Sequence, residues 1–155
     1  MTPIEFIMHG KPAPVGSKKA FAVRGKGGAF RAIVTDDNRR SRPWMSLVAD
    51  AAAQAWDAPP LACAVSVSIE FRMPRPKSHY RTGKNSDRLR DDAPCAHAQT
   101  PDIDKLVRCL IDGISGIVFA DDRQVYEIRA CKVWSDRPGA WVQVNPLNEP
   151  RKASA

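Results

Sequence analysis

Hydrophobic and polar residues alternate along four parts of the chain, and this period of two predicts β-strands. Strands are expected over residues 3–9, 62–73, 124–134 and 140–146, and the alternation is clearest in 62–73, which is rich in β-branched residues. Two shorter strands should flank the stretch GKGG at 25–28, because a run of glycines between extended segments is typical of a hairpin turn.

Two further segments have the spacing of an α-helix. The first is expected to begin near Pro43, because a proline is tolerated in the first turn, where its missing N–H would have no partner in the helix. Its apolar stripe consists of Trp44, Leu47, Val48, Ala51 and Ala55. The second should run over residues 102–113 and end at Gly113 or Gly116. Its inward positions are Leu106, Leu110 and Ile114.

The order of these elements predicts an α+β protein with a small mixed sheet and two main helices. A length of 155 residues suits a single domain, which we expect over 1–146. The polar segment 74–100 has almost no apolar residues, and we expect it to be a mobile loop until an anionic partner binds. Residues 147–155 are expected to form a disordered tail.

The charge of the chain points to its partner. A formal charge of +7 and a pI near 9.5 favour a polyanion, of which nucleic acid is the commonest, although ordinary solubility charge is the alternative. No stretch approaches the roughly 18 consecutive apolar residues of a membrane span, and the N-terminus lacks the pattern of a secretory signal. The scattered cysteines include no CxxC pair, so a cytoplasmic protein with free thiols is expected.

Basic residues are concentrated in the polar segment. They are Arg75, Lys77, Arg81, Lys84, Arg88 and Arg90. Such a segment is predicted to lie along a nucleic-acid backbone. Tyr80 and Phe21, which basic residues flank in loops, are candidates for stacking on exposed bases. The four tryptophans are expected in the core or in a dimer contact.

Aspartates are concentrated elsewhere, since five of them lie in the regular segment around the second helix. Three have an ordinary structural interpretation. An acid in the first turn of a helix gains about 0.3–1 kcal/mol from the helix dipole, and either Thr100 or Asp102 is a candidate N-cap. Arg108 is also spaced to pair with Asp104 and with Asp112 along the helix surface.

That interpretation does not explain Asp121 and Asp122, which are adjacent, repel one another and follow a buried-looking run. In a functional interpretation, Asp102 lies just before the first turn, where its side chain converges with that of Asp104. The chain then returns after the helix and brings the other two aspartates to the same point. Carboxylates gathered in this way require a cation, and an all-oxygen site suits Mg²⁺ or Mn²⁺. Both interpretations stay open on spacing alone.

The stretch PDIDKLVRCLIDGISGIVFADDRQV, followed by EIRACKVW, resembles the RusA family of Holliday junction resolvases, which are common in phages and prophages. The family pattern is Pro-Asp-x-Asp-Asn-Leu, a helix with a Lys and a further Asp, Asp-Asp-x-Gln-Val, and a Lys in the next strand. Weaker likeness in IMHGKPAPVGSKKAF and RPKSHY extends the resemblance over residues 4–145.

The resemblance implies a homodimeric, Mg²⁺-dependent endonuclease that binds four-way DNA junctions and nicks two opposing strands symmetrically, in DNA recombination and repair. The catalytic residues carried over are Asp102, Asp104 and Asp122, which would also be the metal ligands, with Asp121 and Arg108 beside them. The expected DNA-binding residues are Lys18, Lys19, Arg75, Lys77, Arg81, Lys84, Lys105 and Lys132.

Two positions depart from the family pattern. Lys105 stands where the family has Asn, and Arg108 stands where it has the helix Lys. Arginine can grip a phosphate with two N–H groups, but it cannot give up a proton. A non-cleaving DNA-binding protein of the same fold is therefore the alternative hypothesis. A metal-dependent phosphohydrolase of small substrates is a third, and the basic segment argues against it.

Overall fold

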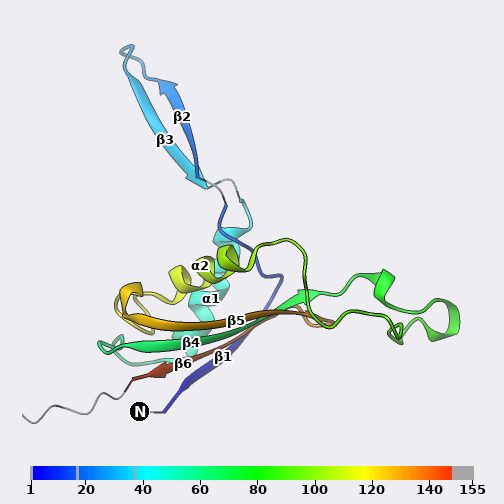
Figure 1. Ribbon diagram of the computed structural model, residues 1–155. Helices are drawn as coiled ribbons and strands as arrows, with labels where there is room; N and C mark the ends of the chain where they lie inside the picture. Colours follow the sequence, from blue (N-terminus) through cyan, green and yellow to red (C-terminus); the bar gives the residue numbers. More distant parts are fainter. Residues whose placement is uncertain (1, 17, 37, 148–155) are drawn as a thin grey trace, which may run out of the picture.

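The computed structural model describes residues 2–16, 18–36 and 38–147 (Figure 1). Its centre is a four-stranded sheet of β1 (Ile4–His9), β4 (Val65–Pro74), β5 (Val125–Ser135) and β6 (Gly139–Pro146), in the order β1-β6-β4-β5. β6 pairs antiparallel with β1 and with β4, whereas β4 and β5 are parallel. The predicted small mixed sheet and the α+β class are therefore confirmed.

Only one face of this sheet is apolar. Along β4 the side chains of Val65, Val67, Ile69, Phe71 and Met73 are buried, and the polar residues between them lie on the other face. This alternation is the pattern that a strand shows when helices cover one side of its sheet and the other side is left polar.

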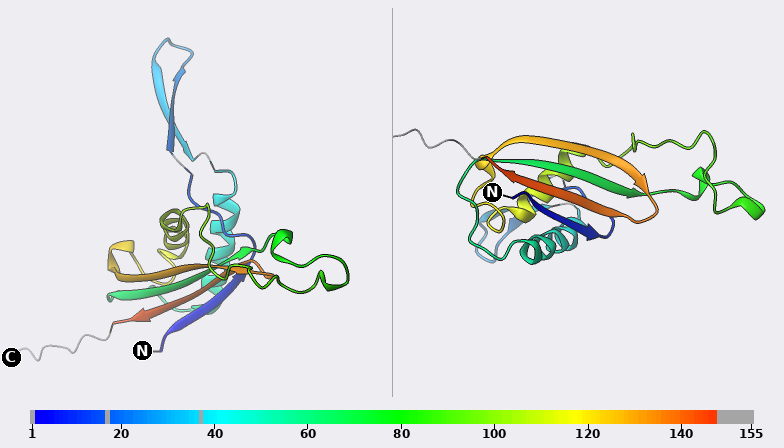
Figure 2. Two further views of the ribbon diagram at one scale, coloured as in Figure 1. Left: turned by 45° about the vertical axis from the view of Figure 1, so that its right-hand side comes forward. Right: turned by 90° about the horizontal axis from the view of Figure 1, so that it is seen from below.

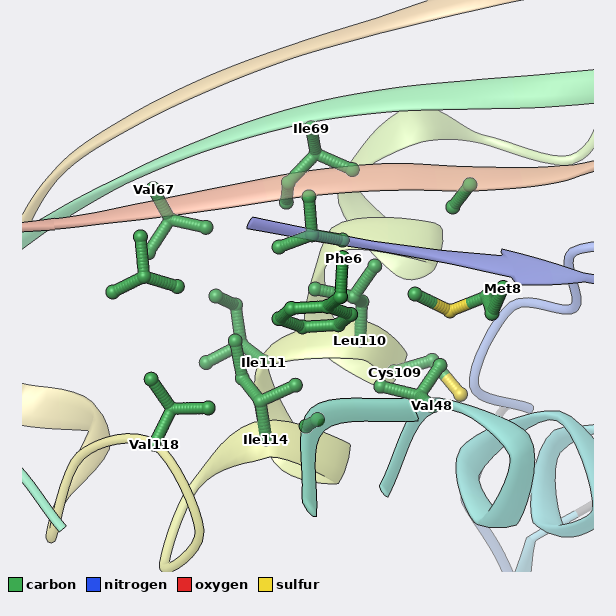
Figure 3. Packing of buried hydrophobic residues seen from close by; sticks show 14 of the residues in the cluster. Phe6, Met8, Val48, Val67, Ile69, Cys109, Leu110, Ile111, Ile114 and Val118 are labelled. Carbon is green, nitrogen blue, oxygen red and sulfur yellow. The ribbon is translucent and has the colours of Figure 1, made fainter. Parts of the chain in front are cut away.

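Two helices cover the apolar face, α1 (Ser41–Ala55) beside β1 and α2 (Ile103–Ile114) beside β5 (Figure 1). Side chains from the strands and both helices interlock between the layers, as Figure 3 shows for Phe6, Val48 and Leu110. The inward positions predicted for the second helix, Leu106, Leu110 and Ile114, are all fully buried.

The stripe predicted for α1 is partly wrong. Trp44, Val48 and Ala52 are buried, at a spacing of four, whereas Leu47 remains 45% exposed and Ala55 lies on the surface. α1 packs at the border of a small sheet and against one neighbouring helix, so it buries a narrower stripe than a helix in the middle of a core.

The two helices meet at Gly113. One of the two predicted endings of α2 was Gly113, and this ending is wrong, because the helix continues through Gly113 to Ile114. The chain then turns at Gly116, whose φ is +81°. A Cβ at Gly113 would lie 3.0 Å from Cγ1 of Val48 and 3.2 Å from Cγ of Met45. The glycine therefore permits the close approach of α1.

Two parts of the chain extend away from this body in different directions (Figure 2). One is a two-stranded ribbon of β2 (Lys18–Arg24) and β3 (Phe30–Asp36), joined by the predicted glycine-rich turn. The other is the segment 75–97. Within the described residues, no helix is long and apolar enough to cross a membrane.

The segment 75–97 has more internal structure than its composition predicts. It contains two short 3₁₀ helices, Lys77–His79 and Gly83–Asn85, and Arg81 N–H donates to the carbonyl of Arg88 at 2.8 Å. The mobility of this segment before a partner binds stays a prediction. Of the predicted disordered tail, 147–155, only Leu147 is described, and its N–H donates to the carbonyl of Ala64 at 2.8 Å; residues 148–155 lie outside the described residues.

The ends of the same segment are fastened to β5. The backbone N–H of His97 donates to the carbonyl of Lys132 at 3.0 Å, and Trp134 donates to Cys95 at 3.2 Å. The rings of His79 and His97 pack on Trp134, with centroid distances of 4.9 and 4.2 Å. Burial lowers the pKa of His97, which favours the neutral form of the ring in this contact.

Replacing Gly113 by alanine is expected to destabilise the fold. Alanine favours a helix over glycine by about 1 kcal/mol, but overpacking between two helices costs about 1–3 kcal/mol. We expect a net loss of about 1 kcal/mol in the free energy of unfolding, measured by urea denaturation. The matched control is Gly27→Ala, since a Cβ there would meet nothing within 4 Å. A more stable Gly113→Ala variant would mean that α1 can move away without loss of packing.

Candidate nucleic-acid and metal site

Asp102 lies immediately before α2, with extended backbone angles of φ −67° and ψ 137°. This is the position that the functional interpretation required, and the choice between Thr100 and Asp102 as N-cap is settled in favour of Asp102. Its side chain makes no capping hydrogen bond; one carboxylate oxygen lies 3.2 Å from Nζ of Lys105 instead. Asp104 follows in the first turn and is exposed. Two solvent-facing carboxylates therefore mark the start of α2.

Contacts from two other elements fix the backbone around these carboxylates. Nζ of Lys132, on β5, donates to the carbonyl oxygens of Gln99 and Pro101 at 2.6 and 2.7 Å. From the other side, Val15 N–H donates to the carbonyl of Lys105 at 3.2 Å. Lys132 was predicted to bind DNA, but here its ammonium group holds the segment that leads into Asp102.

Asp121 and Asp122 belong to a separate turn, the 3₁₀ helix η3 (Asp122–Gln124). Asp121 is its N-cap and accepts a hydrogen bond from Arg123 N–H at 3.0 Å, while the Gln124 side chain accepts from Asp121 N–H at 2.8 Å. The hydrogen bond from Arg123 N–H lowers the pKa of Asp121, and the Arg123 guanidinium adds to this. Asp121 therefore has a structural role in the turn, whereas Asp122 is exposed.

Gln124 joins this turn to the rest of the fold. Its side-chain amide donates to the carbonyl oxygens of Leu61 and Cys63, both at 2.8 Å, just before β4. The residue was not among the predicted site residues, although it follows the two aspartates in the motif. Its three hydrogen bonds fix where Asp122 stands relative to the parallel pair of β4 and β5.

The two acidic pairs do not meet within one chain. α2 and β5 run in opposite directions, so the first turn of α2 lies near Lys132, late in β5, and the turn with Asp122 lies before β5 begins (Figure 1). A helix of 12 residues is about 18 Å long. Across the described residues, no group of three or more His, Cys, Asp or Glu side chains lies close enough to hold a metal ion.

The expected convergence of Asp102, Asp104, Asp121 and Asp122 within one subunit is therefore wrong. The physical reason is the stiffness of α2. Its apolar stripe packs along the sheet, and the chain can only return to β5 after the full length of the helix.

Arg108 lies one turn after Asp104 and is exposed. The ion pair at the start of the helix joins Lys105 to Asp102; no ion pair joins Arg108 to Asp104 or to Asp112 in the described part of the chain. The structural interpretation of these aspartates as surface pairs is therefore not supported at Arg108, whose guanidinium is accessible to an anion.

Several basic residues of the polar segment already have partners, within the segment or on β5. Arg75 donates to the carbonyls of Pro94 and Trp134, and Arg81 forms an ion pair with Asp91 at 2.7 Å. Lys77 and Lys84 are exposed, and no ion pair is found for either among the described residues. Lys77 and Lys84 are therefore better placed than Arg75 and Arg81 to bind a phosphate.

The other predicted contact residues lie elsewhere. Lys18 and Lys19 are the first residues of β2. Tyr80 donates its hydroxyl to Asp136, and this hydrogen bond raises the pKa of the tyrosine. Its ring is thus anchored to the turn before β6, which makes Tyr80 a poorer stacking candidate than Phe21, 51% exposed on the ribbon.

The fold and these residues define a basic α+β protein with carboxylates at both ends of one helix, which is the outline of an enzyme that acts on nucleic acid. The sequence model of the family Endodeoxyribonuclease RusA matches residues 12–145, and the chain belongs to this family. The resemblance is confirmed, and with it the class of enzyme: a hydrolase that acts on DNA. Enzymes of this family are metal-dependent and bind branched DNA junctions.

A curated relative is known from Bacillus subtilis (strain 168), where it carries the name "Uncharacterized protein YqaN". It is 23% identical to this chain over 145 residues, which cover 94% of this chain and 97% of that protein. The similarity thus extends beyond the acidic motif and over the whole domain.

Replacing Gln124 by glutamate is expected to destabilise the fold more than replacing it by alanine. Glutamate would direct a carboxylate at two carbonyl oxygens that now accept hydrogen bonds, so that repulsion adds to the loss of both bonds. We expect Gln124→Ala to cost about 1–3 kcal/mol in the free energy of unfolding and Gln124→Glu to cost more near neutral pH. Urea denaturation at pH 7 and at pH 4 measures both. Equal costs for the two variants would contradict the geometry given above.

Proposed function

We propose that the protein is a homodimeric, Mg²⁺-dependent endonuclease of four-way DNA junctions, in which each metal site is formed by two subunits. Asp102 and Asp104 of one subunit would meet Asp122 of the other. The observation that carries the proposal is the position of the acidic pairs at opposite ends of a rigid α2. Such an enzyme would act in DNA recombination and repair, in the cytoplasm of a bacterium or of a phage-infected host.

A two-fold axis would bring the two ends of α2 together. If α2 of one copy runs antiparallel to α2 of the second, the start of each helix lies beside the end of the other. A two-fold interface is self-complementary, so this arrangement produces two identical acidic sites. Two sites related in this way match the task of nicking two opposing strands symmetrically.

The surface beside α2 offers apolar area for such a contact. Tyr126 is 57% exposed and Ile128 is 44% exposed, on the edge strand β5. Ile128 stands opposite the buried Val67, so it lies on the face of the sheet that the helices cover, beyond the reach of α2. Exposed apolar residues at an unpaired sheet edge are typical of an interface.

The combined donor set fits a hard cation. Three carboxylates supply only oxygen ligands, which suit Mg²⁺ or Mn²⁺ better than softer metals. When bound, such an ion would activate a water molecule and neutralise charge on the scissile phosphate. Asp102 would exchange its contact with Lys105 for the ion, Lys132 would keep the segment before Asp102 in place, and Arg108 would bind a phosphate oxygen.

The remaining predicted DNA contacts belong to this proposal as well. Lys77 and Lys84 on the polar segment, together with Lys18, Lys19 and Lys105, would neutralise phosphates of the junction arms. Arg75 and Arg81 would support the shape of the segment and approach DNA only from its surface. Asp121 would act through the turn that presents Asp122.

Substituting asparagine for Asp102, Asp104 or Asp122 should abolish cleavage and preserve binding. We expect cleavage of a four-way junction to fall by about a thousandfold or more, because the ion loses a charged ligand. Binding should be equal or tighter, since a negative charge near phosphate is removed. The assays are nicking with and without Mg²⁺ and a mobility shift in EDTA. The matched control is Asp50→Asn, an exposed carboxylate of α1 that belongs to neither acidic pair. Loss of binding together with unfolding in all three variants would support a structural role instead.

Mixing two inactive variants tests whether the site is shared. In a heterodimer of Asp102→Asn and Asp122→Asn subunits, a site shared between subunits leaves one site with every carboxylate intact and one site with two defects. Coexpression should therefore restore cleavage of one strand per dimer, whereas each variant alone stays inactive. Light scattering verifies the dimer. An inactive mixture that contains heterodimers would contradict the shared site while leaving the nuclease assignment to the single-variant tests.

A further inference from the structure

The ribbon of β2 and β3 has no role in the fold just described. Every residue from 20 to 33 is exposed, and the seven residues of β3 extend over roughly 24 Å. Isolated two-stranded hairpins are marginally stable in water, so a ribbon that stands away from its own domain is expected to have a partner outside it. Figure 2 shows that neither helix nor sheet covers it.

The composition of the ribbon indicates the chemistry of that partner. Residues 20–33 contain Arg24, Lys26 and Arg31 but no acid. The same stretch exposes Phe21, Val23, Phe30 and Ile33. A protein partner that covered these apolar groups would also have to desolvate the basic residues between them, which is costly without matching acids. DNA offers phosphates for the basic residues and base faces for the aromatic rings.

Phe30 differs from the other apolar residues of the ribbon. At 73% it is the most exposed large hydrophobic residue of the described chain, and it stands beside the turn at the tip. It pairs directly across from Arg24, and the next pair on its face is Ala22 with Ala32. A large ring therefore stands next to a cation at the tip, and the neighbouring pair on its face has only small side chains.

The base of the ribbon is attached close to the proposed metal ligands. Val15, which precedes β2, donates its N–H to the carbonyl of Lys105 in the first turn of α2. On the return from β3, the side chain of Asn38 donates to the carbonyl of Pro14 at 2.8 Å. Both strands of the ribbon thus start from the end of α2 that carries Asp102 and Asp104, so DNA held at these carboxylates lies within reach of the ribbon.

We propose that the ribbon is a DNA-contacting arm whose Phe30 ring stacks on bases exposed at the branch point of the junction, while Arg24 and Lys26 bind the adjacent phosphates. This inference rests on the proposed function and adds to it a source of selectivity for branched over duplex DNA. Stacking is interrupted at a branch point, so a ring enters there at less cost than between the stacked pairs of a duplex.

The test measures binding in EDTA, so that it does not depend on the metal site. The probes are a four-way junction with 2-aminopurine at the branch point and a duplex of the same sequence. Phe30→Ala should lose about tenfold or more in junction affinity and the fluorescence change, with duplex affinity unchanged. Phe30→Trp should retain both. The matched control, Ile33→Ala, removes an exposed side chain from the opposite face of the ribbon and should behave as wild type.

The double variant Arg24→Ala/Lys26→Ala separates the charge from the ring. It should weaken binding to the junction and to the duplex alike, and it should reduce the slope of log affinity against log salt by about 2. Circular dichroism and the thermal midpoint should be unchanged in all variants, because no residue of the ribbon tip contributes to the core.

Three outcomes would overturn the inference. The first is that Phe30→Ala keeps the junction affinity and the fluorescence change of the wild type. The second is that it loses equal affinity for the junction and for the duplex. The third is that the molar mass of the Phe30→Ala variant falls to that of a monomer, which would assign the ribbon to a contact with a second copy of the chain. Failure of the proposed function is distinguishable from these. A wild-type protein that binds the junction through Phe30 but does not cut it in Mg²⁺ refutes the nuclease and leaves the arm intact.

Discussion

The direction and stiffness of α2 constrain the rest of the site. Its apolar stripe is buried against the sheet and against α1, where Gly113 lets the two helices approach closely. A helix fixed in this way, about 18 Å long, cannot bend its ends together, so the carboxylates before it and those after it stay apart within one chain. The separation is a consequence of core packing and not of the acidic residues themselves. In the proposed function, a second subunit would bring the two pairs together.

The residues around each acidic pair fix the backbone more firmly than the side chains. Lys132, Val15 and Gln124 all make hydrogen bonds to main-chain groups near the aspartates. Asp102, Asp104 and Asp122 remain exposed. A site that has to receive an ion and a phosphate benefits from a fixed backbone and accessible oxygens, because the ligands are then positioned before the substrate arrives.

The basic charge of the protein is divided between residues that shape the surface and residues that are accessible on it. Arg75 and Arg81 are held by contacts within the segment 75–97 and to β5, whereas Lys77 and Lys84 face solvent, as do Arg24, Lys26 and Arg31 of the ribbon. Net charge alone does not distinguish these two uses. Contacts do, and they place the accessible basic residues on two separate extensions, one starting near α2 and one near β5. In the proposed function, these extensions would follow the arms of a branched DNA.

The sequence by itself determined the local structure and the class of the protein. Alternation in β4 and the spacing of Leu106, Leu110 and Ile114 are local properties, and each predicted its element and its buried face. The two-part aspartate motif likewise identified the family, because the motif is a property of the chain alone.

Only the tertiary structure decided where these parts lie relative to one another. The spacing of the aspartates could not show that α2 and β5 run in opposite directions. The prediction from spacing therefore placed the aspartates together, whereas the packing of α2 keeps them apart. Nor could it show that Lys132 reaches back to Pro101, that Leu47 faces away from the core, or that the glycine-rich hairpin stands clear of the domain. Each of these depends on contacts between residues distant in sequence, and the packing of the whole chain, not the neighbours of a residue, determines such contacts.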